Sequence, residues 1–227
     1  ANDAVASIRD TIAFDDAVRV ALDFYKKHQD ETLVVVLADH ETGGMSIGFA
    51  GTQYDTFFSK LRFQKGSYLA FDAFLAEYKK AHQTETAKFD DIAAKITEFF
   101  GFRFLSDEKL VDLESKAKGG DSAAAQELEL AVKPREMKEL RSAFEQTMKG
   151  AKERSSDEET YLLYGEYEPL TISLTHILNR KAGIGWTTYA HTGVPVPVSA
   201  IGVGQETFNG YYDNTDVHAK MKAAMGL

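Results

Sequence analysis

The run of seven residues at 32–38, Thr-Leu-Val-Val-Val-Leu-Ala, constrains the fold of this chain more than any other segment. A nearly uninterrupted apolar run of this length is typical of a strand buried on both faces, the usual core of a parallel sheet. The polar turn Asp-His-Glu-Thr-Gly-Gly follows at 39–44. Ligand sites in open α/β sheets lie beyond the carboxyl ends of such strands, so this turn is the first candidate for a functional site.

Asp39 and His40 stand side by side at the start of that turn. A carboxylate supplies a hard oxygen ligand and an imidazole a borderline nitrogen ligand, a combination that suits zinc. The alternative is that Asp39 caps the turn and that His40 packs locally or faces water. These two residues alone leave both interpretations open.

Charge and composition narrow the classes of partner. The 227 residues carry a formal net charge of −9, which argues against nucleic acid or an anionic membrane surface as the main partner. An anionic substrate remains compatible, because bound metal cations would reverse the local field. The absence of cysteine excludes disulfides and thiolate metal sites. No segment is apolar over the length that a bilayer requires, so we expect no membrane partner.

The sequence divides into three regions that differ in composition and in the spacing of their apolar residues. In residues 1–51, apolar residues recur at helical spacing from Phe14 to Tyr25, with Asp15 and Asp16 placed as first-turn acids. The strand at 32–38 and a short second strand at 45–49 complete this part. Residues 166–227 again combine expected helices with an expected strand. They contain a helix at 169–180, a glycine-bounded loop at 183–193, a strand at 196–203 and a final helix from 214–216 to Gly226.

The middle region, about 52–165, is predicted to be helical. Its apolar residues fall at helical spacing at 68–78 and 89–100, and further helices are expected at 110–118 and 122–149, the last broken at Pro134. Asp121 or Ser122 is the expected N-cap after a glycine turn, and residues 152–159 are expected to form a solvated loop. This helical pattern indicates a helical insertion rather than a continuation of the sheet.

Several of these segments together resemble the alkaline phosphatase family. The segments are 36–44 (Val-Leu-Ala-Asp-His-Glu-Thr-Gly-Gly), 185–193 (Gly-Trp-Thr-Thr-Tyr-Ala-His-Thr-Gly) with Val194 to Val198, and the C-terminal stretches 213–216 and 221–227. The resemblance covers residues 1–51 and about 169–227. It implies an α/β fold, part of a three-layer sandwich, with core residues 1–51 and 166–227. Residues 52–165 then correspond to the variable, crown-like insertion of the family.

The resemblance also implies a metal site. Asp39 and His40 align with ligands of the zinc that holds the nucleophile's oxygen, and His191 aligns with a ligand of a second zinc. The pair of cations would flank an in-line phosphoryl transfer. A third site, for magnesium, is expected to take its ligands from sequence upstream of Ala1. Thr42 stands where some family members have a further histidine.

The family's serine or threonine nucleophile, bridging aspartate and phosphate-binding arginine are expected upstream of Ala1, and no Asp-Ser-Ala-type segment occurs in residues 1–227. We therefore interpret the chain as a C-terminal fragment of an enzyme that hydrolyses phosphate monoesters, and we expect the fragment alone to be inactive and to bind zinc weakly. The resemblance implies a periplasmic or secreted protein, its signal outside this chain, and a homodimer as a possible assembly.

Two alternatives are kept. The first is phosphotransfer of the kind catalysed by cofactor-independent phosphoglycerate mutase, whose segments also contain Ala-Asp-His and a His-Thr followed by Pro-Val-Pro. The second is a non-catalytic module whose insertion binds a partner through aromatic residues, although such residues more often form an insertion's own core. These residues are Phe57, Phe58, Phe63, Phe99, Phe100, Phe102 and Phe104.

The other histidines and the tryptophan are expected to have structural roles. His28, His82 and His218 have the pattern of helix-surface residues, whereas His176 falls within an apolar helical pattern and is expected in the core or at an interface. Trp186 either packs within its loop, the favoured interpretation, or lines the pocket. Asp216 is expected to be a first-turn acid of the last helix.

Overall fold

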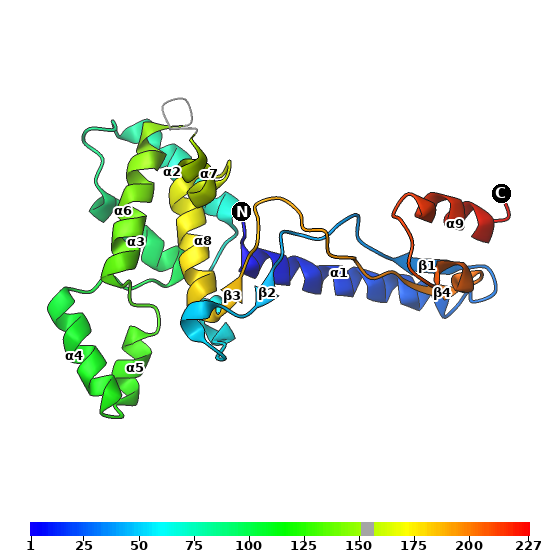
Figure 1. The fold of residues 1–227 in the computed structure, drawn as a ribbon, viewed down its shortest axis with the longest axis horizontal. Coiled ribbons are helices and arrows are strands. Elements are labelled where there is room, and N and C mark those ends of the chain that lie inside the picture. Colours follow the sequence, from blue (N-terminus) through cyan, green and yellow to red (C-terminus); the bar gives the residue numbers. More distant parts are fainter. Residues whose placement is uncertain (151–156) are drawn as a thin grey trace. The chain divides into compact units, whose positions relative to one another are not determined.

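The computed structural model describes residues 1–150 and 157–227, and they form two compact units (Figure 1). Unit 1 contains residues 1–6 and 45–189, and unit 2 contains residues 7–44 and 190–227. Helix α1 (Ala4–Tyr25) begins in the first unit and continues into the second. The predicted division into a core of 1–51 and 166–227 with an insertion at 52–165 follows the family pattern and stays a prediction.

Unit 1 is mainly helical. Two-residue strands β2 (Ser46–Ile47) and β3 (Ile184–Gly185) pair antiparallel, and β2 falls within the predicted short strand. The 3₁₀ helices are η1 (Ala50–Thr52) and η2 (Phe58–Phe63). The α-helices are α2 (Tyr68–Ala81), α3 (Phe89–Phe100), α4 (Asp107–Lys118), α5 (Ser122–Leu128), α6 (Pro134–Lys149), α7 (Glu158–Tyr164) and α8 (Pro169–Ala182).

Helix α8 is the centre of the unit 1 core. It contacts α2, α6 and α7, and its residues are buried around most of its circumference, the polar ones Thr171, Ser173, Thr175 and Asn179 included. Leu170, Ile172, Leu174, Ile177 and Leu178 are completely buried. Several of its buried polar groups are paired: Thr171 donates a hydrogen bond to Asp72 (2.5 Å), and the Lys181 ammonium contacts Glu136 (2.8 Å).

The aromatic residues of the predicted insertion mostly form its core. Phe100 and Phe102 are completely buried, and Phe63, Phe99 and Phe104 are partly buried against the same cluster. Phe57 and Phe58 remain 40% and 44% exposed. The packing interpretation is therefore confirmed for most of these side chains.

Local signals account for several helix boundaries. Pro134 begins α6, as predicted from the expected break, because its missing N–H costs nothing in a first turn. Asp121 caps α5 by accepting hydrogen bonds from the N–H groups of Ala123 and Ala124. The loop prediction for 152–159 is wrong at its end, since Asp157 caps α7 and Glu158 and Glu159 form its first turn; Lys152 to Ser156 lie outside the described residues.

Unit 2 contains a short antiparallel pair of strands. Strand β1 (Leu33–Val36) pairs with β4 (Ser199–Gly202), with Leu33 opposite Gly202 and Val36 opposite Ser199. Both strands were predicted, but the expectation of a parallel arrangement with both faces buried is wrong for this pair. All four residues of β1 are only partly buried. An apolar run indicates that a segment tends to be buried. The direction of a strand relative to its partner depends instead on the long connection between residues 36 and 199, and the local sequence pattern carries no information about it.

Helix α1 begins ten residues earlier than Phe14, so Asp15 and Asp16 lie in its middle rather than in its first turn. Both carboxylates instead contact Arg19, at 2.6 and 3.4 Å. Pairs three and four residues apart face each other on a helix, which explains this arrangement. Element η3 (Gln205–Phe208) and helix α9 (Asp216–Ala224) complete unit 2, and Asp216 is the predicted first-turn acid.

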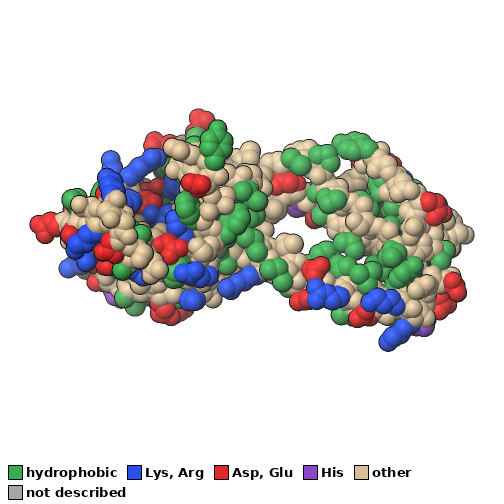
Figure 2. Space-filling view, turned by 90° about the horizontal axis from the view of Figure 1, so that it is seen from below, with side chains coloured by type: hydrophobic (Ala, Val, Ile, Leu, Met, Phe, Trp, Pro, Cys, Tyr) green, Lys and Arg blue, Asp and Glu red, His purple; other side chains and the backbone are tan. Residues whose placement is uncertain are grey.

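The surface of unit 2 carries many apolar side chains, and part of it is visible in Figure 2. Ile12, Val20 and Phe24 of α1 are 60%, 72% and 57% exposed, and Met225 near the C-terminus is 67% exposed. Of the described residues in this unit, Phe208 is the single buried large hydrophobic residue. Among the helices of the described ranges, none has the length and apolarity needed to cross a bilayer.

Candidate metal centre

The three predicted ligands lie together in unit 2. Asp39 and His40 follow the carboxyl end of β1, and the imidazole of His191 comes to the same place from the segment that leads toward β4. The ring centroids of His40 and His191 are 3.5 Å apart, with 33° between the ring planes. Residues separated by 151 positions in sequence are thus in direct contact.

Asp39 approaches His40 in two ways. Its Oδ1 accepts a hydrogen bond from the His40 backbone N–H (3.0 Å), and its Oδ2 lies 3.2 Å from His40 Nε2. The first contact is the local turn that the alternative interpretation predicted. The second contact brings the carboxylate to the edge of the imidazole ring. The same carboxylate therefore both caps the turn and lies beside the ring nitrogen with which it could share a metal ion.

The other nitrogen of His40 fixes which atom is available to a ligand. His40 Nδ1 lies 2.8 Å from the Glu41 carbonyl oxygen, which only accepts, so this nitrogen carries the proton and donates. In the neutral ring, Nε2 is then an acceptor facing the carboxylate oxygen of Asp39. Two acceptors at 3.2 Å call for a cation between or beside them, either a proton or a metal ion. The donor set therefore fits zinc chemically.

Glu41 holds the two segments of the site together, and sequence analysis did not assign it this role. Its carboxylate accepts hydrogen bonds from the backbone N–H (2.6 Å) and hydroxyl (2.5 Å) of Thr192, and from the backbone N–H of Gly44. The bond from the Thr192 hydroxyl is the main reason that the pKa of Glu41 is lowered from 4.5 to about 2. Thr192 directly follows His191, so this clamp positions the second imidazole.

The site opens into a cleft of about 700 Å³ within unit 2. One wall is the segment from Leu37 to Glu41, a second is the segment from Thr192 to Val198, and a third includes Tyr211, Tyr212 and Asp213. Among the described residues there is no cluster of three or more acidic, histidine or cysteine side chains arranged to hold one metal ion. Asp39, His40 and His191 therefore form only part of a ligand set, and the site they form is open toward the cleft.

The remaining histidines lie elsewhere. His218 is exposed on α9, and His28 contacts Glu31 (3.0 Å) at the end of α1. His82 stacks on Tyr78 with a centroid distance of 4.1 Å. His176 is largely buried in unit 1, as predicted, and Trp186 lines a different hollow from the cleft of Asp39 and His40.

A comparison with protein-family models shows to which family the sequence belongs. The alkaline phosphatase model matches residues 1–227, the whole chain. The chain belongs to the alkaline phosphatase family. This confirms the resemblance inferred from the motifs at 36–44 and 185–193, and it favours the phosphatase over the mutase alternative.

Known alkaline phosphatases match nearly the whole chain. Alkaline phosphatases 3 and 4 of Bacillus subtilis (strain 168) are 30% and 27% identical over 216 residues, covering 95% of this chain and 35% and 34% of those proteins. The repressible alkaline phosphatase of Saccharomyces cerevisiae is 25% identical over 224 residues, which is 95% of this chain and 32% of that protein. The chain thus spans about a third of the length of these relatives.

A solved structure supports the same fold. The crystal structure of a cold-active alkaline phosphatase from a psychrophilic Shewanella species aligns with a TM-score of 0.60 at 26% identity, covering 98% of this chain and 41% of that one. The predicted fold class, α/β with a mainly helical insertion, is confirmed, with the strand direction in unit 2 corrected as described above.

Proposed function

We propose that the complete protein hydrolyses phosphate monoesters and that Asp39, His40 and His191 contribute ligands to its metal centre. The observation that carries this proposal is the contact between His40 and His191 beside the Asp39 carboxylate, in a chain of the alkaline phosphatase family. A net charge of −9 does not oppose an anionic substrate at such a centre, because metal cations would supply the positive field.

Each residue has a distinct part in this proposal. Asp39 and His40 would hold one zinc and His191 a second, while the Glu41 carbonyl fixes the His40 tautomer and the Glu41 carboxylate fixes the position of Thr192. Bound zinc would act as a Lewis acid and lower the pKa of a bound water to about 7. The serine or threonine nucleophile is expected upstream of Ala1.

Alanine variants of the complete protein test the ligand assignment. Asp39→Ala, His40→Ala and His191→Ala should each remove most hydrolysis of an aryl phosphate and lower the zinc content measured by metal analysis. His218→Ala is the matched control, because His218 is exposed on α9 of the same unit. Wild-type activity and zinc content in the three ligand variants would refute the assignment while leaving the family intact.

An activity assay of the 227-residue chain by itself tests whether the active centre also needs residues from outside this chain. We expect no hydrolysis of an aryl phosphate by this chain with added zinc and magnesium, because the nucleophile and the remaining ligands are expected outside it. Turnover that survives purification and is lost in His191→Ala would contradict this expectation. The magnesium site, a homodimer and export from the cytoplasm are further proposals that rest on the family alone.

A further inference from the structure

The loop between β3 and β4, residues 186–198, carries His191 and contains no helix or strand of its own. Its position therefore depends on contacts made by individual residues. On the C-terminal side of His191, Thr192 is bound by the Glu41 carboxylate. The contacts on the N-terminal side centre on Tyr189, which belongs to unit 1.

The Tyr189 hydroxyl binds the end of helix α7. It donates a hydrogen bond to the Leu163 carbonyl oxygen (2.7 Å) and lies 3.2 Å from the Leu162 carbonyl oxygen. Both carbonyls are among the last four of α7, and the last four carbonyls of a helix have no partner within the helix. The phenol therefore caps this helix end, and the same contact fixes its own oxygen.

Gly165, the residue that follows α7, makes room for the ring of Tyr189. Its φ is +57°, a conformation that residues with a side chain rarely adopt. A Cβ built on Gly165 would lie 2.8 Å from Cγ of the Tyr189 ring, closer than real Cβ atoms come to their neighbours. The ring thus lies directly against the backbone of this residue, which glycine alone permits because it has no Cβ.

Further contacts of the ring come from α7, α8 and the turn between them. Tyr189 stacks on His176 of α8, with ring centroids 5.7 Å apart and 18° between the planes. Tyr161 meets the ring edge-on at 6.2 Å, and Tyr167 lies at 6.1 Å. Burial raises the pKa of Tyr189 to about 12, so the hydroxyl keeps the proton that it donates at neutral pH.

The residue before Tyr189 is held as well. The Thr188 carbonyl accepts a hydrogen bond from the Asn2 side-chain amide (3.1 Å), and the Asn2 carbonyl accepts one from the side-chain amide of Asn179 in α8 (2.6 Å). Asn2 and Asn179 are both buried, and breaking a buried hydrogen bond leaves its polar groups unpaired. Two consecutive residues of the loop are therefore fixed to the framework of unit 1.

We propose that Tyr189 is a positioning residue for the metal centre, because it ties the loop that bears His191 to helix α7 of the predicted insertion. Only Ala190 separates the two residues, and two residues of extended chain span at most about 7 Å. A displacement of Tyr189 therefore changes the positions open to the His191 imidazole. The insertion thus acts on the centre without supplying a ligand. The importance of this position for hydrolysis rests on the proposed function.

Tyr189→Phe tests the hydroxyl, because it keeps the ring and removes the bond to α7. In the 227-residue chain, we expect the imidazole resonances of His191 in NMR to shift; they are identified by their loss in His191→Gln. In the complete protein, the affinity for zinc should fall about two- to tenfold, up to the value of one neutral hydrogen bond. Raised free zinc should then restore hydrolysis of an aryl phosphate, since the ligand is intact, whereas His191→Ala should not be rescued.

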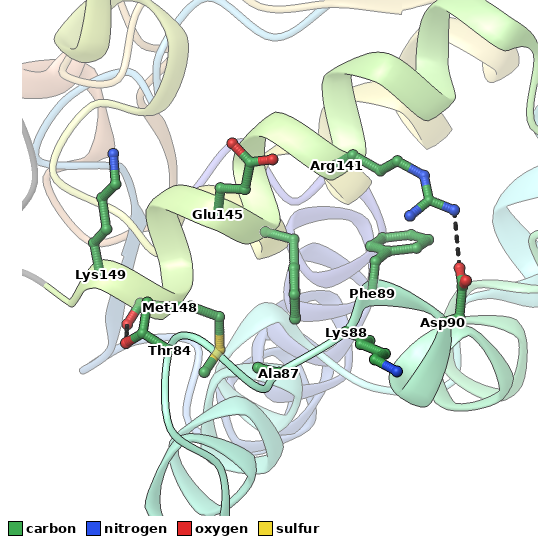
Figure 3. Close-up of a pocket in the computed structure, with 10 residues that line it drawn as sticks. Thr84, Ala87, Lys88, Phe89, Asp90, Arg141, Glu145, Met148 and Lys149 are labelled. Carbon is green, nitrogen blue, oxygen red and sulfur yellow. Dashed lines mark hydrogen bonds and ion pairs between the residues drawn. The ribbon is translucent and has the colours of Figure 1, made fainter.

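Tyr78→Phe is the matched control, since it also removes a tyrosine hydroxyl from a buried side chain of unit 1. That hydroxyl lies 3.2 Å from the Asp91 carboxylate and 3.4 Å from the Lys88 carbonyl. Lys88 lines a separate hollow of about 520 Å³, and Tyr189 is not among the residues that line it (Figure 3). Tyr78→Phe should leave the His191 resonances, the zinc affinity and the activity unchanged.

Gly165→Ala tests the same link from the side of the insertion. The added Cβ would displace the Tyr189 ring, so the His191 resonances should shift although no residue of the loop has changed. Gly120→Ala is its control, because Gly120 also has a positive φ (+93°) but nothing beyond its chain neighbours lies within 4 Å of the added Cβ. Circular dichroism checks that both variants are folded.

The proposal is overturned if Tyr189→Phe shifts the His191 resonances no more than Tyr78→Phe does, and this comparison decides even where Gly165→Ala does not fold. An unchanged zinc affinity in Tyr189→Phe would equally show that the anchor does not act on the centre. If the His191 resonances respond as expected but the complete protein hydrolyses no phosphate ester, the anchor stands and the proposed function is refuted instead.

Discussion

At the scale of single residues, the contact between Glu41 and Thr192 decides where His191 lies. The Thr192 hydroxyl and backbone N–H both bind the Glu41 carboxylate, so the segment bearing His191 is held beside the turn that bears His40. Thr192→Val removes the hydroxyl at nearly constant volume. We expect the contact between the two imidazoles to loosen, and in the complete protein a 10- to 100-fold loss of metal affinity, roughly as for other outer-shell changes.

The chain supplies a matched control for this variant. Thr42 lies two residues after His40, but it is exposed and makes no side-chain hydrogen bond in the described structure. Thr42→Val should leave the imidazole resonances of His40 and His191 unchanged, whereas Thr192→Val should shift both. Equal effects of the two variants would mean that Glu41 does not position this segment through the Thr192 hydroxyl.

His176 gives unit 1 a defined response to pH. Burial, Arg180 and the amino terminus lower its pKa from 6.5 to about 4, so the unfolded chain binds a proton that the folded chain excludes. The free energy of unfolding should therefore fall as pH falls from about 6.5 to about 4, by roughly 3 kcal/mol. Below about pH 4 the folded ring is also protonated and this dependence ends.

The measurement is denaturant unfolding at several pH values, followed by the emission of Trp186. His176→Gln should flatten the dependence between pH 6.5 and 4, whereas His218→Gln, an exposed control, should not. A wild-type slope in His176→Gln would show that other groups cause the pH response.

The candidate site was predictable from sequence in part. Asp39, His40 and His191 follow from motifs, because each motif is a short run with a distinctive composition. The role of Glu41 was not found, since an acid in a turn has many uses and its partner Thr192 lies 151 residues away. The available signal was that an acid, Glu41, and a hydroxyl, Thr192, each directly follow a predicted ligand histidine. The hollow around Trp186 was missed because its wall comes from five separate segments.

At the scale of elements, Asp3 joins the beginnings of two helices. Its buried carboxylate accepts from the Ala6 N–H in the first turn of α1 (3.0 Å) and from the Tyr68 N–H at the start of α2 (2.9 Å). It also accepts from the buried side-chain amide of Gln64 (2.8 Å). Asp3→Ala should destabilise unit 1 by about 2–4 kcal/mol, because it removes both caps and leaves the amide unpaired.

Asp10→Ala is the control for that change, since Asp10 is an exposed acid on the same helix. It should alter the unfolding free energy by less than about 0.5 kcal/mol. Thermal or urea unfolding followed by circular dichroism separates the two expectations. A loss below about 1 kcal/mol in Asp3→Ala would show that solvent replaces the carboxylate at the helix ends.

The helices could be predicted more fully than the sheets for a physical reason. Period-3.6 patterns and caps such as Asp121 and Pro134 are local, so α2, α3, α5, α6 and α8 were located from sequence. The start of α1 was missed although Val5, Ile8 and Ile12 stand at helical spacing in its first turns, so the signal was present in the sequence before Phe14. Strand pairing joins residues such as Val36 and Ser199 across the whole chain, and no local pattern specifies direction or register.

At the scale of the whole molecule, the two units differ in how much core they contain. The unit 1 core includes fully buried side chains from α2, α3, α6 and α8, whereas Phe208 is the one buried large hydrophobic residue among the described residues of unit 2. Stability against local opening follows buried apolar contact. We therefore expect amide hydrogens of 7–44 and 190–227 to exchange faster than those of α8, on the order of a hundredfold or more.

Hydrogen exchange with mass spectrometry tests this expectation on the chain as it is. The exposed apolar side chains of unit 2 should also bind a hydrophobic dye such as ANS, since they form surface that globular proteins normally cover. If the complete protein contains the remainder of the family fold, the same peptides should become protected there and the dye signal should fall. Equal protection of both units in the isolated chain would show that unit 2 is stabilised by means other than a buried core.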